Sequence, residues 1–286
     1  MNYRHIYHAG NFADVFKHIM LMMALDYLKQ KDKPLFALDT HAGIGLYDLK
    51  SVEAQKTGEA AAGIGRLWAR DDAPEEIKKY LSLIKTFNAG NDLCFYPGSP
   101  LIMQEMLRGG DRMVVNELHP DDHITLRKNM KGDRRARIED QDGYIAMKAH
   151  LPPHERRGLV LCDPPFEVTN EFDLMLAGLK NAYARWATGI YMFWYPVKDP
   201  AIISKYHQSL AAAGIPKITA IEFLKQKSVD KSAFNGTGLV IVNPPWTMAD
   251  QARTILPWLV DVLTDGHGHY NITQITGEKL DDTARH

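Results

Sequence analysis

Short apolar runs that alternate with helical segments are the feature that most restricts how this chain can fold. Each run is four to six residues long and reads as a buried strand. The strand-like runs cover residues 34–38, 93–96, 112–116, 136–139, 158–162, 190–194, 218–223 and 239–242. Strands separated by helices predict an α/β fold, in which a doubly wound, mostly parallel sheet is covered by helices on both faces.

The helical segments divide into an N-terminal helix, the connections between strands and one longer region. Residues 11–31 have apolar side chains at helical spacing, and Asn11 is placed to cap the helix. Residues 47–90 are polar and helical without a clear strand, so we expect them to form a small inserted subdomain. The 286 residues are otherwise expected to form a single domain over 1–286.

Composition excludes several classes of protein. The formal net charge is −1, so a nucleic-acid partner would have to be held by local patches. Residues 19–25 form the longest apolar stretch, which is too short to span a bilayer, and the N-terminus lacks the apolar region of a signal peptide. Cys94 and Cys162 lie in predicted strands without metal-ligand spacing, which favours two buried thiols in the cytoplasm and no metal site.

Polar residues at the ends of the predicted strands indicate a ligand site. In doubly wound sheets, ligands bind beyond the carboxyl ends of the strands. Those ends carry Asp39, His41, Gly43, Glu117, Asp142 and Asp163. A single acid in a loop carries little information, but polar groups at four strand ends, two of them beside glycines, favour a shared site.

The turn after the first strand and the two acids that follow point to a nucleoside cofactor without phosphates. Gly43 and Gly45 form a tight turn after Asp39, but this is neither a dinucleotide fingerprint nor a phosphate loop. Glu117 can bind both ribose hydroxyls, and Asp142-Gly143 can accept from an adenine amino group. S-adenosylmethionine fits this set, with donors for its carboxylate expected from Lys17, His18, His41 and Ser99.

Asp163-Pro164-Pro165-Phe166 has the chemistry to hold an amino group on a planar ring. The two prolines stiffen the turn and remove two backbone donors, so their carbonyls remain able to accept. Phe166 offers a flat face for stacking. A carboxylate, a carbonyl and an aromatic face together suit the exocyclic amino group of a nucleobase.

A second copy of this pattern, Asn243-Pro244-Pro245-Trp246, competes for the same role. The segment before its strand, Gly236-Thr237-Gly238, leaves no room for a crossover helix, so the strand must pair antiparallel. Its carboxyl end then points away from the site, and we expect Trp246 to pack at the bottom of the sheet. Counted from the glycine turn, Asp163 ends the fourth strand, next to the first, and is the favoured copy.

These motifs together resemble the class I S-adenosylmethionine-dependent amino-methyltransferases. The match narrows to the bacterial 23S ribosomal RNA adenine-N6 methyltransferases of the large-subunit J type and extends over nearly the whole chain. The segments that carry it are Tyr3-Arg4-His5, His8-Ala9-Gly10-Asn11, Ala13-Asp14-Val15, Lys17-His18, Asp39-Thr40-His41-Ala42-Gly43, Tyr96-Pro97-Gly98-Ser99-Pro100, Glu117-Leu118-His119-Pro120, Asp163-Pro164-Pro165-Phe166 and Trp194-Tyr195-Pro196.

The resemblance implies a seven-stranded sheet whose last strand is antiparallel, and it assigns roles to individual residues. Asp163 resembles the catalytic acceptor, and Tyr3 resembles a contact to the substrate RNA. Cofactor contacts are implied for His18, His41, Ser99, Glu117, Asp142, Gly143 and Asp163. The chain departs from the family at Phe166, where relatives often have tyrosine. Phenylalanine can still stack on a base, but it lacks the hydroxyl, so any role of that hydroxyl is absent.

The expected chemistry is methylation of an adenine N6 in 23S ribosomal RNA. Asp163 and the Pro164 carbonyl would each accept one N6–H bond, and Phe166 would stack on the base. The RNA could be held by the N-terminal cluster Tyr3, Arg4, His5 and Tyr7, or by a basic cluster formed by Arg127, Lys128, Lys131, Arg134, Arg135 and Arg137.

Two other readings remain open from the sequence. The same amino-group motif serves a DNA adenine or cytosine methyltransferase, although no region reads as a target-recognition domain. The second alternative is a non-catalytic RNA-binding protein with a degenerate methyltransferase fold. The presence of Asp39, Glu117, Asp142 and Asp163 argues against this alternative. The favoured expectation is a cytoplasmic monomer that acts on free or partly assembled ribosomal RNA.

Overall fold

The computed structural model describes residues 4–226 and 233–278 of the chain as an α/β fold. The strands are β1 (Phe36–Asp39), β2 (Leu46–Asp48), β3 (Phe95–Pro97), β4 (Arg112–Asn116), β5 (Ala136–Glu139), β6 (Gly158–Cys162), β7 (Ile190–Val197), β8 (Ile218–Leu224), β9 (Gly236–Val242) and β10 (His269–Thr276). The helices are η1 (His5–Tyr7), α1 (Phe12–Lys29), α2 (Val52–Thr57), α3 (Glu59–Ala62), α4 (Ile64–Leu67), α5 (Glu75–Thr86), α6 (Ser99–Met106), α7 (Pro120–Asn129), α8 (Gly143–His150), α9 (Glu171–Arg185), α10 (Pro200–Ala211) and α11 (Met248–Thr264).

The main sheet has the strand order β10-β8-β9-β7-β6-β1-β4-β5. Pairing is parallel from β5 to β7, and β6 lies directly beside β1, as strand order predicted for the strand that ends at Asp163. β9 pairs antiparallel with both β7 and β8. The predicted mostly parallel sheet and the antiparallel strand at residues 239–242 are therefore confirmed.

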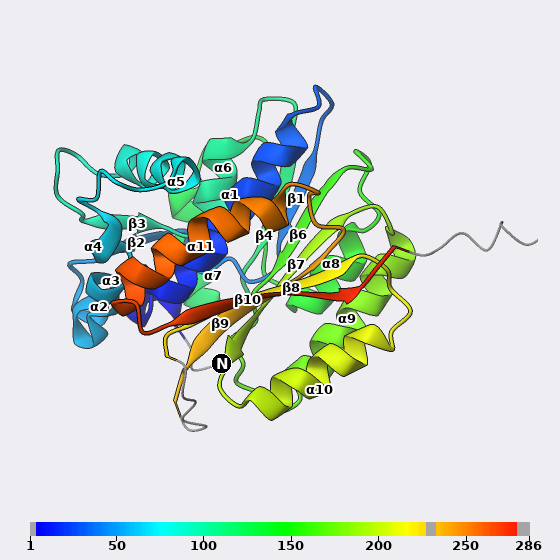
Figure 1. The fold of residues 1–286 in the computed structure, drawn as a ribbon. Helices are drawn as coiled ribbons and strands as arrows, with labels where there is room; N and C mark the ends of the chain where they lie inside the picture. Colours follow the sequence, from blue (N-terminus) through cyan, green and yellow to red (C-terminus); the bar gives the residue numbers. More distant parts are fainter. Residues whose placement is uncertain (1–3, 227–232, 279–286) are drawn as a thin grey trace, which may run out of the picture.

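Helices cover both faces of the sheet, as the alternation predicted (Figure 1). One face packs against a core formed largely by α1, α6 and α11, together with the helices α4 and α5. The other face packs against α8, α9 and α10. Alternate side chains of β1 show the division, because Ala37 faces the first core and Leu38 the second.

Helix α1 is buried over most of its length. Asn11 caps it by accepting from the backbone N–H groups of Ala13 and Asp14, as predicted. Residues 12–25 are all buried, although Asp14, Lys17 and His18 are polar. Buried charged groups are costly unless they are paired, so these three side chains must find partners inside the protein.

The main sheet has eight described strands rather than the seven that the resemblance implied. The additional strand is β10, which pairs antiparallel with β8 at the sheet edge. Its residues are half-buried or exposed, so they lack the apolar run that marks a buried strand.

The run at residues 93–96 was wrongly predicted as a strand of the main sheet. The strand that forms here, β3, pairs antiparallel with the three-residue β2. The sequence analysis did not predict β2. Cys94 precedes β3 and is only half-buried, so the expectation of two buried thiols holds for Cys162 alone. Four short helices occupy most of residues 47–90, while the boundary of an inserted subdomain stays a prediction.

The second proline motif lies away from the carboxyl ends of the parallel strands, as expected, but the predicted packing of Trp246 was wrong. Asn243 follows β9 and donates from Nδ2 to the carbonyls of Ala187 and Gly189, each at 2.8 Å, in the turn that leads into β7. Trp246 is 78% exposed and does not pack beneath the sheet. The antiparallel direction of β9 sends this motif to the edge where β7 begins, away from the carboxyl ends of the parallel strands.

Candidate active site

A cavity of about 580 Å³ lies beyond the carboxyl ends of β1, β4, β5 and β6. It is also lined by η1, α1 and the carboxyl-terminal half of β7. Eleven residues that the sequence singled out line this one cavity: Lys17, His18, His41, Gly43, Ser99, Glu117, Asp142, Gly143, Asp163, Pro164 and Phe166. The structure therefore brings them together, while their individual roles stay predictions.

Glu117 is fixed by the glycine turn that it faces. Its Oε2 accepts from the Gly43 backbone N–H at 2.8 Å, and its Oε1 accepts from the His119 N–H at 2.8 Å. Gly43 has a φ of +61°, and a Cβ there would come within 2.1 Å of the Tyr47 hydroxyl oxygen, so only glycine fits. Burial raises the pKa of Glu117 above its usual value. Each oxygen retains a lone pair that can accept a ribose hydroxyl.

Asp142 and Gly143 form the start of helix α8. Asp142 Oδ1 accepts from the N–H groups of Tyr144 and Ile145, so this carboxylate also caps the helix. A Cβ on Gly143 would lie 2.6 Å from the His41 ring, so glycine allows the imidazole to approach the helix. His41 contacts the Thr40 hydroxyl through Nδ1 at 2.8 Å, and burial lowers its pKa to about 4. His41 is therefore neutral at pH 7.

Asp39 is the most deeply buried acid among the predicted residues. It is 0% exposed, and its Oδ1 accepts from the His41 N–H at 3.2 Å. Its Oδ2 has no hydrogen-bond partner in the described structure. Burial raises the pKa of this carboxyl to about 6. An unpartnered oxygen at this depth is an acceptor that a bound ligand or an ordered water would satisfy.

The Asp163 motif turns the chain sharply after β6. Phe166 has a φ of +53°, a left-handed conformation that costs a non-glycine residue roughly 1–2 kcal/mol. The conformation is held by ring contacts with Phe172 at 5.1 Å and Trp194 at 5.9 Å between centroids, both edge to face. The turn therefore stores strain to present Asp163, Pro164 and Phe166 to one cavity.

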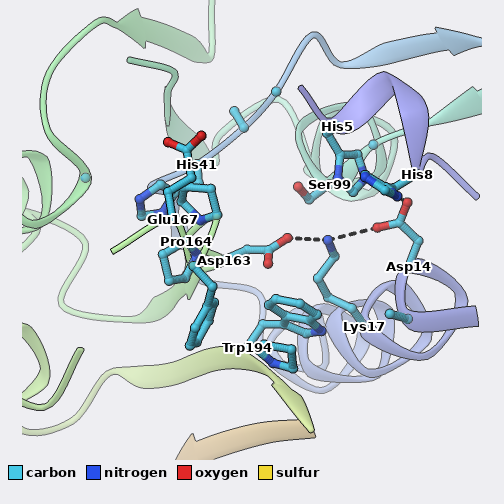
Figure 2. A pocket seen from close by; sticks show the side chains of 18 of the residues that line it. His5, His8, Asp14, Lys17, His41, Ser99, Asp163, Pro164, Glu167 and Trp194 are labelled. Atoms are coloured by element: carbon cyan, nitrogen blue, oxygen red, sulfur yellow. Dashed lines mark hydrogen bonds and ion pairs between the residues drawn. The ribbon is translucent and has the colours of Figure 1, made fainter. Parts of the chain in front are cut away.

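Lys17 occupies a position that the sequence did not foresee. Its ammonium bonds Asp163 Oδ2 and lies 2.9 Å from Asp14 Oδ1, so it bridges two carboxylates (Figure 2). The Lys17 side chain is 5% exposed. Burial opposes its charge, but the two acids outweigh burial and raise its pKa. The role of Lys17 as a donor to the carboxylate of the cofactor stays a prediction; in this structure its ammonium holds Asp163.

His18 and Ser99 line the same cavity. His18 Nδ1 lies 2.7 Å from the Tyr96 hydroxyl, which also contacts the Tyr80 hydroxyl at 2.9 Å. Burial lowers the pKa of His18 to about 3, so the ring is neutral at pH 7 and can donate from only one nitrogen. Ser99 begins α6 and is buried.

Two lining residues, Asp14 and Trp194, lie in segments that carry the resemblance but were assigned no role in the site. Asp14 lies three residues before Lys17 on α1, and this helical spacing was an available signal. Trp194 stands near the carboxyl end of β7, where the strand-end rule applies to it as well. Its Nε1 donates to the Thr237 hydroxyl on β9 at 2.6 Å, which anchors the indole beside Phe166.

The two predicted RNA-binding clusters differ in position. Tyr3 lies outside the described residues, while Arg4 pairs with Asp122 at 2.5 Å, and His5 and His8 line the cavity. In the basic cluster, Arg134 and Arg135 precede β5 and so lie at the amino edge of the sheet, opposite the cavity. Arg135 donates to the carbonyls of Gln104 and Leu107, and Arg137 pairs with Glu139. Which cluster contacts RNA stays a prediction, and of the two the N-terminal cluster lies beside the cavity.

The lining of the cavity fits a cationic ligand that lacks phosphates. Its acidic side chains are Asp14, Glu117, Asp122, Asp142, Asp163, Glu167 and Glu171, against two lysines, Lys17 and Lys198. Such an excess of carboxylates disfavours a polyphosphate and suits a sulfonium and an amino group. S-adenosylmethionine carries both.

Comparison with known proteins identifies close relatives over almost the full chain. The family model RsmJ, described as Ribosomal RNA large subunit methyltransferase D, RlmJ, matches residues 32–276. Two proteins named Ribosomal RNA large subunit methyltransferase J are similar. The one from Haemophilus influenzae is 45% identical over 97% of this chain, and the one from Escherichia coli K12 is 43% identical over 97%; each is covered completely.

Solved structures agree with this result at the level of the fold. The crystal structure of protein LPL1258 from Legionella pneumophila is 38% identical, covers 96% of this chain and all of its own, and superposes with a TM-score of 0.88. A probable spermidine synthase from Corynebacterium glutamicum covers 95% of this chain and 82% of its own with a TM-score of 0.52 at 9% identity, and shares the fold alone. In the part of the chain that the structure describes, no helix is long and apolar enough to cross a membrane.

Proposed function

The chain belongs to the RlmJ family of ribosomal RNA large-subunit methyltransferases, and on this premise we propose that it methylates the N6 amino group of one adenine in 23S ribosomal RNA. The methyl donor is S-adenosylmethionine. The observation that carries the proposal is the position of Asp163, which ends β6 beside β1 and shares one cavity with Glu117, Asp142 and Gly43. A carboxylate for the amino group thus lies beside groups suited to an adenosine.

The assignment of cofactor contacts follows from the chemistry of each group. Glu117 accepts the ribose hydroxyls with the lone pairs that Gly43 and His119 leave available. Asp142, at the start of α8, accepts from the adenine amino group, and Gly143 leaves room for the His41 ring beside it. The donors for the carboxylate of the amino-acid tail come from His18, His41 and Ser99, since Lys17 is engaged with two acids. When bound, S-adenosylmethionine supplies a methyl group on a cationic sulfur.

The protein's part in methyl transfer is to orient and polarise the amine. Asp163 Oδ1 and the Pro164 carbonyl accept the two N6–H bonds, which turns the nitrogen lone pair toward the methyl group. Oriented acceptors of this kind contribute about 3 kcal/mol to transition-state stabilisation for each well-placed group. Lys17 keeps the other oxygen of Asp163 in place through its ion pair. Nitrogen then loses one proton to solvent, so the charge of the product balances.

The substrate base must leave its stack to reach the cavity. Phe166 provides a stacking face near the base, and stacking of this type is worth about 1–3 kcal/mol. Trp194 and Phe172 support Phe166 from the side and so keep the ring in place. We assign contacts with the surrounding RNA to the N-terminal segment that includes Tyr3 and Arg4.

The proposal extends to the setting in which the enzyme works. We infer a cytoplasmic monomer that acts on free or partly assembled ribosomal RNA. Two free cysteines agree with a reducing compartment. A flipped adenine is more accessible before ribosomal proteins cover the RNA.

Transfer of a labelled methyl group tests the proposal directly. Wild-type protein, S-adenosylmethionine and deproteinised ribosomal RNA are incubated, and the modified base is mapped by digestion and mass spectrometry. We expect one N6-methyladenine in 23S RNA and none with Asp163→Ala. Methylation of duplex DNA in preference to RNA would favour a DNA amino-methyltransferase. Failure of the protein to bind S-adenosylmethionine in calorimetry would favour a non-catalytic RNA-binding protein.

A further inference from the structure

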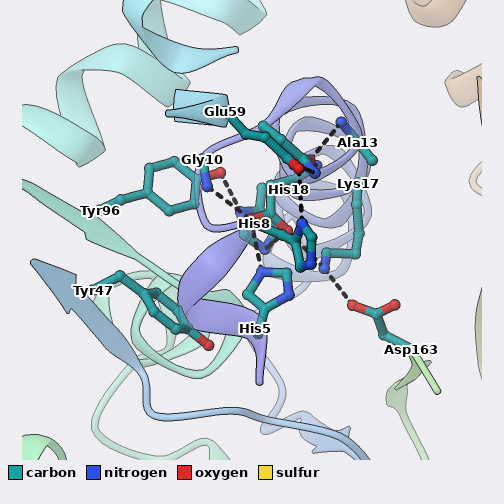
Figure 3. Close-up of polar contacts among 12 residues, drawn as sticks. His5, His8, Gly10, Ala13, Lys17, His18, Tyr47, Glu59, Tyr96 and Asp163 are labelled. Atoms are coloured by element: carbon teal, nitrogen blue, oxygen red, sulfur yellow. Dashed lines mark hydrogen bonds and ion pairs between the residues drawn. The ribbon is translucent and has the colours of Figure 1, made fainter. Parts of the chain in front are cut away.

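The carboxylate of Asp14 is the centre of a buried polar cluster that the proposed chemistry does not use. It is 1% exposed, and it holds groups from η1, from the turn before α1 and from α1 itself. Asp14 Oδ2 accepts from the Gly10 N–H at 2.9 Å and lies 2.8 Å from His5 Nε2, while Oδ1 lies 2.9 Å from Lys17 Nζ (Figure 3).

We propose that Asp14 is a positioning residue for methyl transfer, because it shares the Lys17 ammonium with Asp163 and thereby fixes Asp163 with one oxygen toward the substrate amine. The inference rests on the proposed function, since it assumes that Asp163 accepts from the amine. Asp14 itself does not contact the reacting atoms. Its effect is transmitted through Lys17, whose ammonium bonds both acids.

Charge balance in the buried cluster explains why a second carboxylate is needed. A single carboxylate would have to compensate the whole buried charge of Lys17 and would be drawn onto the ammonium, whereas two acids share that charge. With Asp14 present, Lys17 is held between two acids that approach it from α1 and from the turn after β6. Asp163 can then keep Oδ2 on Lys17 while its other oxygen faces the cavity, as the arrangement in Figure 2 allows.

The same carboxylate ties the catalytic turn to the segment that we assign to RNA contacts. His5 belongs to η1 and contacts Asp14, and the preceding Arg4 pairs with Asp122. RNA that orders the N-terminal segment would therefore act on the cluster that holds Asp163. In this arrangement Asp14 couples binding at the N-terminus to the geometry of the acceptor.

Other titratable groups surround Lys17, and they belong to every element packed around it. They are His5 on η1, Asp14 and His18 on α1, Asp39 on β1, Tyr80 on α5, Tyr96 on β3 and Asp163 after β6. Burial opposes the charge of Lys17, whereas Asp14 and Asp163 raise its pKa. Removal of either acid therefore lowers the pKa of Lys17.

The substitution Asp14→Asn tests the proposal, and Asp111→Asn is its matched control. Asp111 is also a nearly fully buried carboxylate that accepts from a backbone N–H and pairs with an arginine, but it precedes β4 at the edge opposite the cavity. We expect Asp14→Asn to lower the single-turnover rate of RNA methylation by about 10- to 100-fold, by analogy with groups that orient a catalytic side chain. Asp111→Asn should keep the wild-type rate.

The pH profile separates positioning from a merely structural role. With both acids present, Lys17 stays charged through the range in which RNA can be assayed. In Asp14→Asn only Asp163 opposes burial, so the pKa of Lys17 is lowered and the rate should begin to fall at a lower pH than in the wild type. Wild type and Asp111→Asn should show no such fall. A loss of rate that is equal at every pH would overturn the proposal.

A wild-type rate in Asp14→Asn would also overturn it, while RNA methylation by the wild-type protein would leave the proposed function intact. If Asp14→Asn does not fold, Asp14→Ser removes the same charge with a smaller side chain and leaves space for water. The same alkaline loss is expected for it, and its absence would count against the proposal. Absence of RNA methylation by the wild-type protein would instead reject the proposed function.

Discussion

The two proline motifs of this chain have nearly the same local sequence and opposite surroundings. Asp163 follows a parallel strand, pairs with Lys17 and lines the cavity. Asn243 follows an antiparallel strand and braces the turn before β7 through two carbonyls. Phe166 is held edge to face between two rings, whereas Trp246 is 78% exposed.

Strand direction, rather than the motif, separates the two. Each turn contains one non-glycine residue in the left-handed region, Phe166 with φ +53° and Asn243 with φ +51°. Asparagine adopts this region more readily than phenylalanine, so the turn at Phe166 carries more strain than the turn at Asn243. Only the first turn delivers its carboxylate to an edge where other strands also end in polar groups.

The largest difference should appear when the first residue of each motif is removed. We expect Asp163→Ala to lower kcat for RNA methylation by about 10²- to 10³-fold, because an oriented acceptor for the developing charge is lost. Asp163→Asn, which keeps the shape but not the charge, should lose most of the same activity. Asn243→Ala should keep a kcat within about twofold of wild type. Equal losses of kcat in Asp163→Ala and Asn243→Ala would contradict the assignment of Asp163 to catalysis and of Asn243 to the fold.

The aromatic residues should differ by a smaller factor. Phe166→Ala removes a stacking face, which corresponds to about 1–3 kcal/mol and hence to about 5- to 150-fold in kcat/KM. Trp246→Ala removes an exposed ring and should leave kcat/KM and stability unchanged. Steady-state kinetics with ribosomal RNA measure the first effect, and thermal unfolding measures the second. Phe166→Tyr, which restores the residue that relatives often carry, should retain activity.

We expect the second proline motif, which begins at Asn243, to contribute to the stability of the fold. Asn243→Ala removes two hydrogen bonds to backbone carbonyls, one of them partly buried, and places alanine in a left-handed conformation. Together these should lower the free energy of unfolding by about 2 kcal/mol. Urea denaturation followed by circular dichroism measures the change. A stability equal to that of wild type would show that the brace between β9 and the turn before β7 is not needed.

Acid should affect the cavity and leave the second motif unchanged. The pKa of His18 is lowered by burial to about 3, so between pH 6.5 and 3 the unfolded state binds a proton that the folded state does not. This contribution destabilises the fold as pH falls, by at most about 1.4 kcal/mol per pH unit. Asp39, with a pKa raised to about 6, acts in the opposite sense between about pH 6 and 4.

A non-titrating replacement isolates the contribution of His18. The slope of unfolding free energy against pH below 6.5 should become shallower in His18→Gln and should remain that of wild type in Asn243→Ala. Denaturation series at several pH values give both slopes. An unchanged slope in His18→Gln would mean that the imidazole titrates normally in the folded protein.

Much of the fold followed from patterns that depend on burial. The apolar runs predicted the central strands because both faces of the sheet are covered, and Asn11 predicted the start of α1 because capping is local. β10 was missed because an edge strand needs no apolar run. β2 and β3 were misread because three residues carry too little periodicity.

The site was foreseen in its residues but not in its contacts. Strand ends placed Asp39, Glu117, Asp142 and Asp163 at one edge, since that follows from topology. The bond from Lys17 to Asp163 spans 146 positions in the chain, and no local pattern reports it. Trp246 was misplaced because strand direction gives the edge that a residue reaches but not whether its side chain is covered.

The position of β9 between β7 and β8 has a consequence for synthesis on the ribosome. A nascent chain that ends at β8 contains β7 and β8 but not β9, the strand that lies between them. Each of these two strands then presents an unpaired edge to other chains. Trp194, which lines the cavity, lacks its hydrogen-bond partner Thr237 until β9 has been synthesised. The wall of the cavity beside Phe166 is therefore completed late in synthesis, after the strands that carry Glu117 and Asp163.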